Sequence, residues 1–374
     1  PGTHSARLCD MANRQNAASP ASIRPLPYKH VDAMQISAST SRELTTLRGS
    51  LASLAGMPPP DALAALVQEG HAGLPLPGHG ATLARWQALA AVGAHDLPLA
   101  KVFEGHTDAV AILHEANAHV LADLAQATWG TWCAEPPDAR LALLASADGP
   151  ILRGRKAWCS GAHGVTHAVV SCWDADGAPM LAAVDLRQRG VRVTDDGWHA
   201  VGMRATASVD VWFDDVVATP LGGPGFYVER AGFWQGGAGV AACWFGAATR
   251  LADALRERLA ERSDPHRLAQ LGEVTVALQG CAALIREAAA AIDSAPGANA
   301  MRTAMTVRLS VEAAANSVLH AVGRALGAGP LCKDPALAQL YADLPVFMRQ
   351  SHAERDLEAV GKLVAAMESA PWTL

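Results

Sequence analysis

The segment 165–197 reads VTHAVVSCWDADGAPMLAAVDLRQRGVRVTDDG and decides the fold class. Runs rich in Val, Ala and Leu alternate in it with clusters of Asp and Gly, which are turn residues. These runs predict strands at 165–173, 180–186 and 191–194. No helical pattern separates them, so consecutive strands pair through short turns. The segment therefore predicts a compact antiparallel barrel or sandwich.

Similar runs at 141–144 and 207–213 extend this β region on both sides, and we place a central β domain at 128–222. The preceding part, 28–127, predicts an N-terminal helical domain. Its first helix shows leucines at spacings of 3, 4 and 3 between positions 44 and 54, which is an amphipathic pattern. The helices are expected at 31–54, 62–68, 83–92 and 107–128.

Residues 223–374 predict a C-terminal helical bundle. Proline and glycine separate most of its long helical runs, and long helices with short connections pack antiparallel. These helices are expected at 226–262, 266–293, 298–325, 335–349 and 352–369. The fold class is thus α+β and multidomain: a helical domain, a central antiparallel β-barrel or sandwich, and a four-helix bundle. Residues 1–27, rich in Ser, Ala, Asn and Pro, predict a disordered tail.

Composition excludes several classes of function. The chain has 30 Lys and Arg against 36 Asp and Glu, a net charge of −6, so it lacks the basic field of a nucleic-acid-binding protein. No apolar run reaches the length of a membrane-spanning helix, and residues 1–27 lack the apolar stretch of a secretory signal. Met11 is a candidate for the first residue of the native chain.

The seven cysteines include no C-x-x-C pair, which favours a reducing, cytoplasmic location. Abundant Ala and an excess of Arg over Lys suggest a bacterial source.

Local motifs give weak signals. His114 and His119 are five residues apart, whereas a zinc-binding helix needs four, so no metal site is predicted. A GxGxxA match at 237–242 follows no strand, and we interpret it as a helix whose small residues allow close packing. Cys159 is either a reactive thiol or a buried apolar residue, and the second is favoured.

His352 and Asp356 lie one helical turn apart in a dense charged group at 349–356. Two interpretations stay open for this group. It is either a solvated helix start or an acid–base site, because a histidine beside carboxylates can exchange a proton near neutral pH.

Three strings in order resemble the acyl-CoA dehydrogenase superfamily of flavoproteins, of which this chain would be a divergent member. Residues 154–162, GRKAWCSGA, are similar to the family's G-x-K-x-(W/F)-I-(T/S)-x-A. Residues 202–206, GMRAT, lead into 209–216, VDVWFDDV, as in G-x-R-x-(S/T) followed by F-(D/E)-D-V. Residues 133–136, CAEP, are similar to (L/V)-T-E-P. The resemblance covers about residues 30–370 and implies FAD bound between the β domain and the bundle.

The resemblance also implies roles for single residues. Trp158 would lie against the isoalloxazine ring and Ser160 would hydrogen-bond near its reactive edge. The backbone at Cys133 and Ala134 would contact the pyrimidine end. Arg262 would reach the FAD phosphates of a neighbouring subunit, which implies a homodimer or homotetramer.

Departures from the family pattern concern catalysis. The family's G-S-D is replaced by residues 137–140, PDAR. The usual glutamate base is absent from both of its positions, which align with about 351–353 and with Gly236 and Gly237. His352 is the nearest candidate to replace it, and Glu354 is the second.

Three functions follow as hypotheses. The first is an FAD-dependent oxidoreductase that dehydrogenates an acyl thioester, in which a base removes the α-proton and a hydride passes to the flavin. The second is a flavin monooxygenase, in which reduced flavin from a partner reductase reacts with oxygen and a pair such as Ser160 and His352 steadies the peroxide. The third is a degenerate member that binds FAD or a partner without turnover. The missing glutamate and G-S-D favour the second and third over a standard fatty acyl-CoA enzyme. The expected partners are a small-molecule substrate, such as an acyl-CoA, and an electron-transfer protein or flavin reductase.

Overall fold

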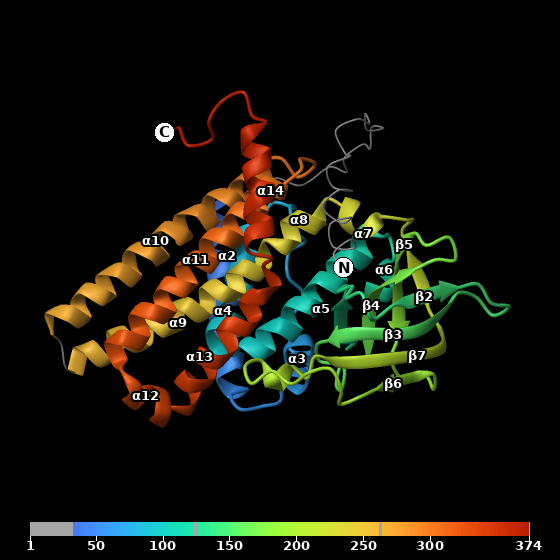
Figure 1. Cartoon of the computed structure of the whole chain (residues 1–374), viewed down its shortest axis with the longest axis horizontal. Helices are drawn as coiled ribbons and strands as arrows, with labels where there is room; N and C mark the ends of the chain where they lie inside the picture. Colours follow the sequence, from blue (N-terminus) through green and yellow to red (C-terminus); the bar gives the residue numbers. More distant parts are fainter. Residues whose placement is uncertain (1–32, 123, 125, 262–263, 374) are drawn as a thin grey trace.

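The computed structural model describes residues 33–122, 124, 126–261 and 264–373, and the tail predicted at 1–27 lies outside them. The helices from both ends of the chain gather on one side of the molecule and the sheet lies on the other, with α5 (Leu97–Glu115) running between them (Figure 1). This confirms the α+β class and the order helices, sheet, helices. The division into domains at 127 and 222 stays a prediction.

The N-terminal helices follow the predicted pattern with one error. They are α2 (Ala33–Ser53), α3 (Pro59–Gln68), α4 (Thr82–His95), α5 and the short α6 (His119–Ala122). The helix predicted at 107–128 begins ten residues earlier, at Leu97, and ends at Glu115. The Asp96 carboxylate caps it by accepting from the Leu99 N–H at 2.6 Å, and Pro98 stands in its first turn.

A single eight-stranded sheet replaces the predicted barrel or sandwich. Its order is β6-β7-β3-β2-β4-β5-β8, and β1 pairs with β4 outside this path. The strands are β1 (Trp129–Trp132), β2 (Leu141–Leu144), β3 (Ile151–Cys159), β4 (His167–Trp173), β5 (Pro179–Asp185), β6 (Val191–Val193), β7 (Val209–Val217) and β8 (Thr219–Leu221). The sequence did not predict β1, β3 or β8.

The sheet is mostly antiparallel, but β1 and β2 both run parallel to β4. They follow one another along the same edge of β4, with β1 beside 167–170 and β2 beside Trp173. The chain between them, 133–140, therefore leaves the sheet and returns to it. This excursion brings Cys133 and Ala134 out of the ladder.

The C-terminal region is helical, as predicted. It contains α7 (Phe226–Glu229), α8 (Gly232–Gly237), α9 (Gly239–Glu261), α10 (Pro265–Ser294), α11 (Met301–Leu326), α12 (Ala328–Lys333), α13 (Pro335–Phe347) and α14 (Glu354–Ala365). The single helix expected at 226–262 is broken, because Arg230 adopts an extended conformation after α7. Within the described residues, α10 alone is long and apolar enough to cross a membrane, and it packs along α11 and α9.

Close helix packing joins the two helical regions. A Cβ on Gly93 of α4 would stand 2.3 Å from the Cys243 carbonyl oxygen of α9, and one on Gly246 would stand 2.0 Å from the Ala90 oxygen. Only glycine permits this backbone contact. One hydrophobic core therefore continues from the N-terminal helices through the sheet into the bundle.

Candidate active site

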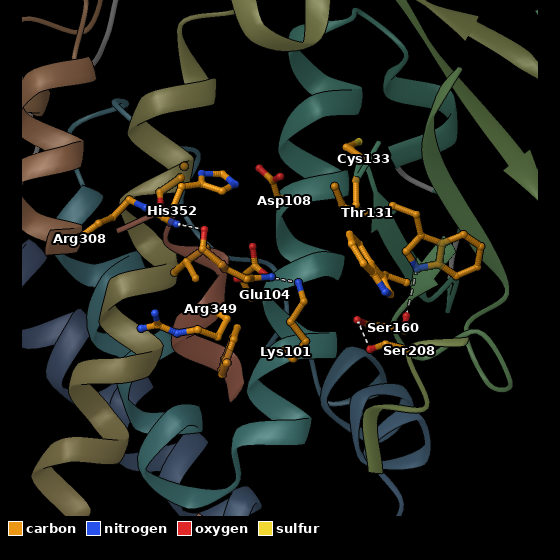
Figure 2. A pocket seen from close by; sticks show the side chains of 18 of the residues that line it. Lys101, Glu104, Asp108, Thr131, Cys133, Ser160, Ser208, Arg308, Arg349 and His352 are labelled. Carbon is orange, nitrogen blue, oxygen red and sulfur yellow. Dashed lines mark hydrogen bonds and ion pairs between the residues drawn. The ribbon is translucent and has the colours of Figure 1, made fainter. Parts of the chain in front are cut away.

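A cavity of about 850 Å³ opens where α5, the ends of β1 and β3, α8, α11 and the segment 345–356 meet. Its size is within the range of about 300–1,000 Å³ of small-molecule sites. Figure 2 shows Ser160 and His352 on opposite sides of this cavity, with charged side chains of α5 between them.

Aromatic side chains form much of the cavity wall, among them Trp132, Trp158, Tyr227, Phe233 and Trp234. Trp158 has a φ of +58°, which a bulky residue rarely adopts, and its side chain is half exposed. The β3–β7 register shifts between Lys156 and Cys159. This irregularity turns Trp158 out of the sheet and into the cavity, and such backbone strain clusters at functional sites.

Ser160 ends a chain of hydroxyl groups. Its Oγ lies 2.7 Å from Ser208 Oγ, which lies 2.8 Å from Thr206 Oγ1, which donates to the Met203 carbonyl oxygen at 2.8 Å. Each hydroxyl has one proton. Thr206 uses its hydroxyl hydrogen in the hydrogen bond to the carbonyl oxygen. Ser208 must therefore donate a hydrogen bond to Thr206, and Ser160 must donate one to Ser208. Ser160 therefore faces the cavity as a hydrogen-bond acceptor.

Ionic groups on α5 occupy the cavity floor. Lys101 Nζ lies 2.9 Å from Glu104 Oε2. One turn further on, Asp108 accepts from the buried Arg230 at 3.3 Å, and the same guanidinium lies 3.1 Å from Glu115. Burial lowers the pKa of Arg230, but the two carboxylates outweigh burial and raise it, so the guanidinium stays charged.

His352 is held at the opposite side by Asp356. The Asp356 carboxylate accepts from the His352 backbone N–H at 3.0 Å and lies 3.4 Å from its ring Nδ1. Burial raises the pKa of Asp356, but the hydrogen bonds from His352 outweigh it and bring the pKa below its usual value. The charged Asp356 carboxylate thus holds both the backbone and the ring of His352.

The cavity brings together five residues that the sequence placed in the site: Cys133, Ala134, Trp158, Ser160 and His352. Glu354 does not line the cavity and is exposed at the first turn of α14. Arg262 lies outside the described residues. The roles of all seven remain proposals.

Two predictions about reactive groups can be compared with the geometry. Cys159 is fully buried, and burial raises the pKa of its thiol, so it is not a ready nucleophile. Among the described residues, no group of three or more His, Cys, Asp and Glu is arranged to hold a metal ion. The His114 and His119 rings are hydrogen-bonded to each other at 3.0 Å.

Sequence reasoning missed Glu104, Asp108, Arg230, Thr206 and Ser208. A signal was present for the first two. Lys101, Glu104 and Asp108 recur at spacings of 3 and 4, so they share one face of an otherwise apolar helix. Charges on such a face suggest a polar site in the interior. Ser208 gave no signal, because its role depends on the pairing of β3 with β7.

Known proteins resemble this chain in sequence over part of its length. No protein-family profile matches the sequence. Dibenzothiophene monooxygenase of Rhodococcus erythropolis is 31% identical over 211 residues, covering 47% of this chain and 50% of that protein. The chain thus matches about half the length of its curated relatives.

Solved structures share the fold over nearly the whole chain. KijD3 in complex with FMN and a dTDP-linked amino sugar has a TM-score of 0.72 at 22% identity, covering 92% of this chain and 97% of that one. TdsC from Paenibacillus sp. A11-2, with FMN and indole, has a TM-score of 0.74 at 18% identity, covering 87% and 96%. At such identities the likeness shows the fold alone.

Proposed function

We propose that this protein is a flavin-dependent monooxygenase that binds reduced FMN and oxygenates a small aromatic substrate. This was the second hypothesis from sequence, and it now ranks above dehydrogenation of an acyl thioester. The partial match to dibenzothiophene monooxygenases supports it. FMN replaces the FAD expected from sequence, because FMN is bound in the KijD3 and TdsC structures.

The acceptor role of Ser160 is the observation that carries the proposal. The family resemblance implies that Ser160 would lie near the reactive edge of the flavin. There, oxidised flavin presents an unprotonated N5, which needs a donor, whereas reduced flavin presents an N5–H, which needs an acceptor. Ser160 donates its hydroxyl hydrogen bond to Ser208, so it can only accept from the flavin and suits the reduced form. A dehydrogenase must first bind oxidised flavin.

The cavity also fits a flavin in other respects. Trp158 offers a large apolar surface for a planar ring, and Cys133 and Ala134 line the same cavity. When bound, reduced flavin supplies two electrons, with which one atom of O₂ is added to the substrate and the other leaves as water. His352, across the cavity from Ser160, is placed to hold or give a proton, and the aromatic wall excludes water (Figure 2).

Partners follow from this chemistry as part of the proposal. A separate flavin reductase would supply the reduced cofactor. A homodimer or homotetramer, with Arg262 reaching a neighbouring site, remains the proposed assembly.

The test compares the two redox states of FMN on the full-length chain under anaerobic conditions. We expect reduced FMN to bind at least tenfold more tightly than oxidised FMN. The oxidised form has no N5–H and so loses the hydrogen bond to Ser160. Ser208→Ala releases the Ser160 proton for donation and should reduce this ratio, whereas Ser146→Ala, in an exposed turn, should not.

Oxygen admitted with indole and reduced FMN should then yield a product heavier by one oxygen atom in mass spectrometry. Equal affinity for both redox states, or bleaching of bound oxidised flavin by an acyl-CoA, would instead support the dehydrogenase hypothesis. A chain that binds neither form would support the degenerate one.

A further inference from the structure

Asp108 presents an open carboxylate oxygen to the cavity. Its Oδ1 accepts from Arg230, while its Oδ2 has no hydrogen-bond partner within the described residues. The side chain is 15% exposed and projects from α5 between His352 and Cys133 (Figure 2). An ionised oxygen in such a place acts only as an acceptor.

Asp108 belongs to a network of paired charges. The buried Arg230 guanidinium lies between two carboxylates, those of Asp108 and Glu115. Lys101 pairs with Glu104, and the charge of the buried Arg85 interacts with both Asp108 and Glu104. Because the open Oδ2 can only accept, a ligand that donates a hydrogen bond to it is favoured, and one without a donor leaves the carboxylate desolvated.

Two glycines of α8 make room for the two carboxylates that pair with Arg230. A Cβ on Gly232 would stand 1.9 Å from Glu115 Oε1, and a Cβ on Gly236 would stand 3.2 Å from Asp108 Oδ1. Gly236 is one of the two positions that align with the family's alternative glutamate base. The Asp108 carboxylate therefore lies against the place where a side chain at 236 would begin.

Three aromatic side chains line the same cavity as the Asp108 carboxylate. Phe233 lies with its ring centroid 5.1 Å from Tyr227 and 5.0 Å from Trp234, both at steep interplanar angles. All three line the cavity on the same segment as Arg230. Edge-to-face surroundings of this kind suit a planar aromatic ligand.

We propose that Asp108 determines substrate specificity by accepting a hydrogen bond from an aromatic N–H, so that the substrate class is N–H heteroaromatic compounds rather than their sulfur analogues. This inference rests on the proposed function, since it assigns the substrate of the same cavity. Asp108 contacts the substrate, and Arg230 acts as a positioning residue that fixes which carboxylate oxygen is open.

The experiment measures binding of indole and benzothiophene, two bicyclic ligands of similar shape, to the full-length chain with and without FMN by equilibrium dialysis. We expect indole to bind about ten- to a hundredfold more tightly, because benzothiophene leaves the acceptor unpaired. In Asp108→Asn, Arg230 can only donate and so holds the amide oxygen. The NH₂ group then replaces Oδ2, and the preference for indole should vanish or invert.

Two further variants keep the test independent of the folding of Asp108→Asn. Gly236→Ala favours the helix but crowds Asp108 Oδ1, and it should lower the indole preference. Asp148→Asn, in an exposed turn, removes the same charge outside the cavity and should leave the preference unchanged. Equal binding of the two ligands by the unmodified chain, binding of neither, or a full preference in Asp108→Asn would overturn the proposal.

FMN titration of the same samples separates this inference from the proposed function. A chain that prefers indole through Asp108 but does not bind FMN would retain the assignment of Asp108 and refute the monooxygenase.

Discussion

The buried Lys156 and the partly buried Glu135 form an ion pair that joins the two segments carrying the proposed flavin contacts. Lys156 Nζ lies 2.5 Å from Glu135 Oε1, and the lysine side chain is 2% exposed. Lys156 also donates to Ser171, and Trp173 Nε1 donates to the other Glu135 oxygen at 2.9 Å. Glu135 follows Ala134, and Lys156 precedes Trp158. One pair therefore fixes both walls of the site relative to each other.

Lys156→Met should lower the free energy of unfolding by about 3–5 kcal/mol, because it leaves the Glu135 carboxylate buried without its cation. Urea denaturation measures the change. Arg153→Met is the matched control. Arg153 lies on β3, like Lys156, and forms an exposed pair with Asp215 of β7, so its loss should cost less than about 1 kcal/mol. Adding Glu135→Gln to Lys156→Met should recover stability, and a double variant no more stable than the single one would contradict this account.

Trp158→Ala should weaken FMN binding by about 1–3 kcal/mol, because it removes a large apolar surface from the cavity wall. Fluorescence titration of FMN measures the affinity. Trp212→Ala, at an exposed position of β7 outside the cavity, is the control. Unchanged affinity in Trp158→Ala would place the flavin elsewhere.

Regular patterns in the sequence predicted much of the fold. Strand β2 was predicted at its exact bounds, and β4, β5 and α10 within two residues, since their apolar runs end at clear turn residues. Strand β3 was missed because Gly154, Arg155 and Lys156 interrupt its apolar alternation. Lys156 is buried there because Glu135 neutralises it and Ser171 accepts from it, and Glu135 comes from the loop between β1 and β2.

Sequence alone could predict only part of the site. Ser160 and His352 face one cavity because the sheet and the bundle meet there. The resemblance to a family suggested Ser160, and both that resemblance and the spacing to Asp356 suggested His352. The acceptor role of Ser160 depends on Ser208, which β7 brings beside it. Asp108 was missed because the expected helix began at Thr107, so Lys101 and Glu104 were not seen to share its face.

His352→Ala should lower turnover by about 10²–10⁴, the usual loss for one acid–base residue, with FMN still bound. The His352 side chain is 57% exposed, so its removal should change Tm little. His266→Ala, an exposed histidine at the start of α10 and outside the cavity, is the matched control and should keep its turnover. A variant that melts early but turns over normally per folded, flavin-loaded molecule would give His352 a structural role only.

His106 should make the protein less stable as the pH falls from 7 to 5. The ring is buried, and its Nδ1 accepts from the Trp129 N–H at 3.1 Å, which requires the neutral form. Burial, with a smaller contribution from the Arg85 charge, lowers the pKa of His106 to about 4. The unfolded chain, with a pKa near 6.5, binds the proton first, so stability is complete above about pH 6.5 and is lost towards pH 4.

The expected loss from this one residue is about 2 kcal/mol of unfolding free energy between pH 7 and pH 5. Urea denaturation at both pH values measures it. His106→Gln offers an oxygen to the Trp129 N–H and does not titrate, so its stability should change by that much less over the same interval. Subtraction of the two proteins removes the contribution of the carboxylates, which titrate in both. Equal pH dependence in the variant and the unmodified chain would show that His106 is protonated in the folded state as readily as in the unfolded one.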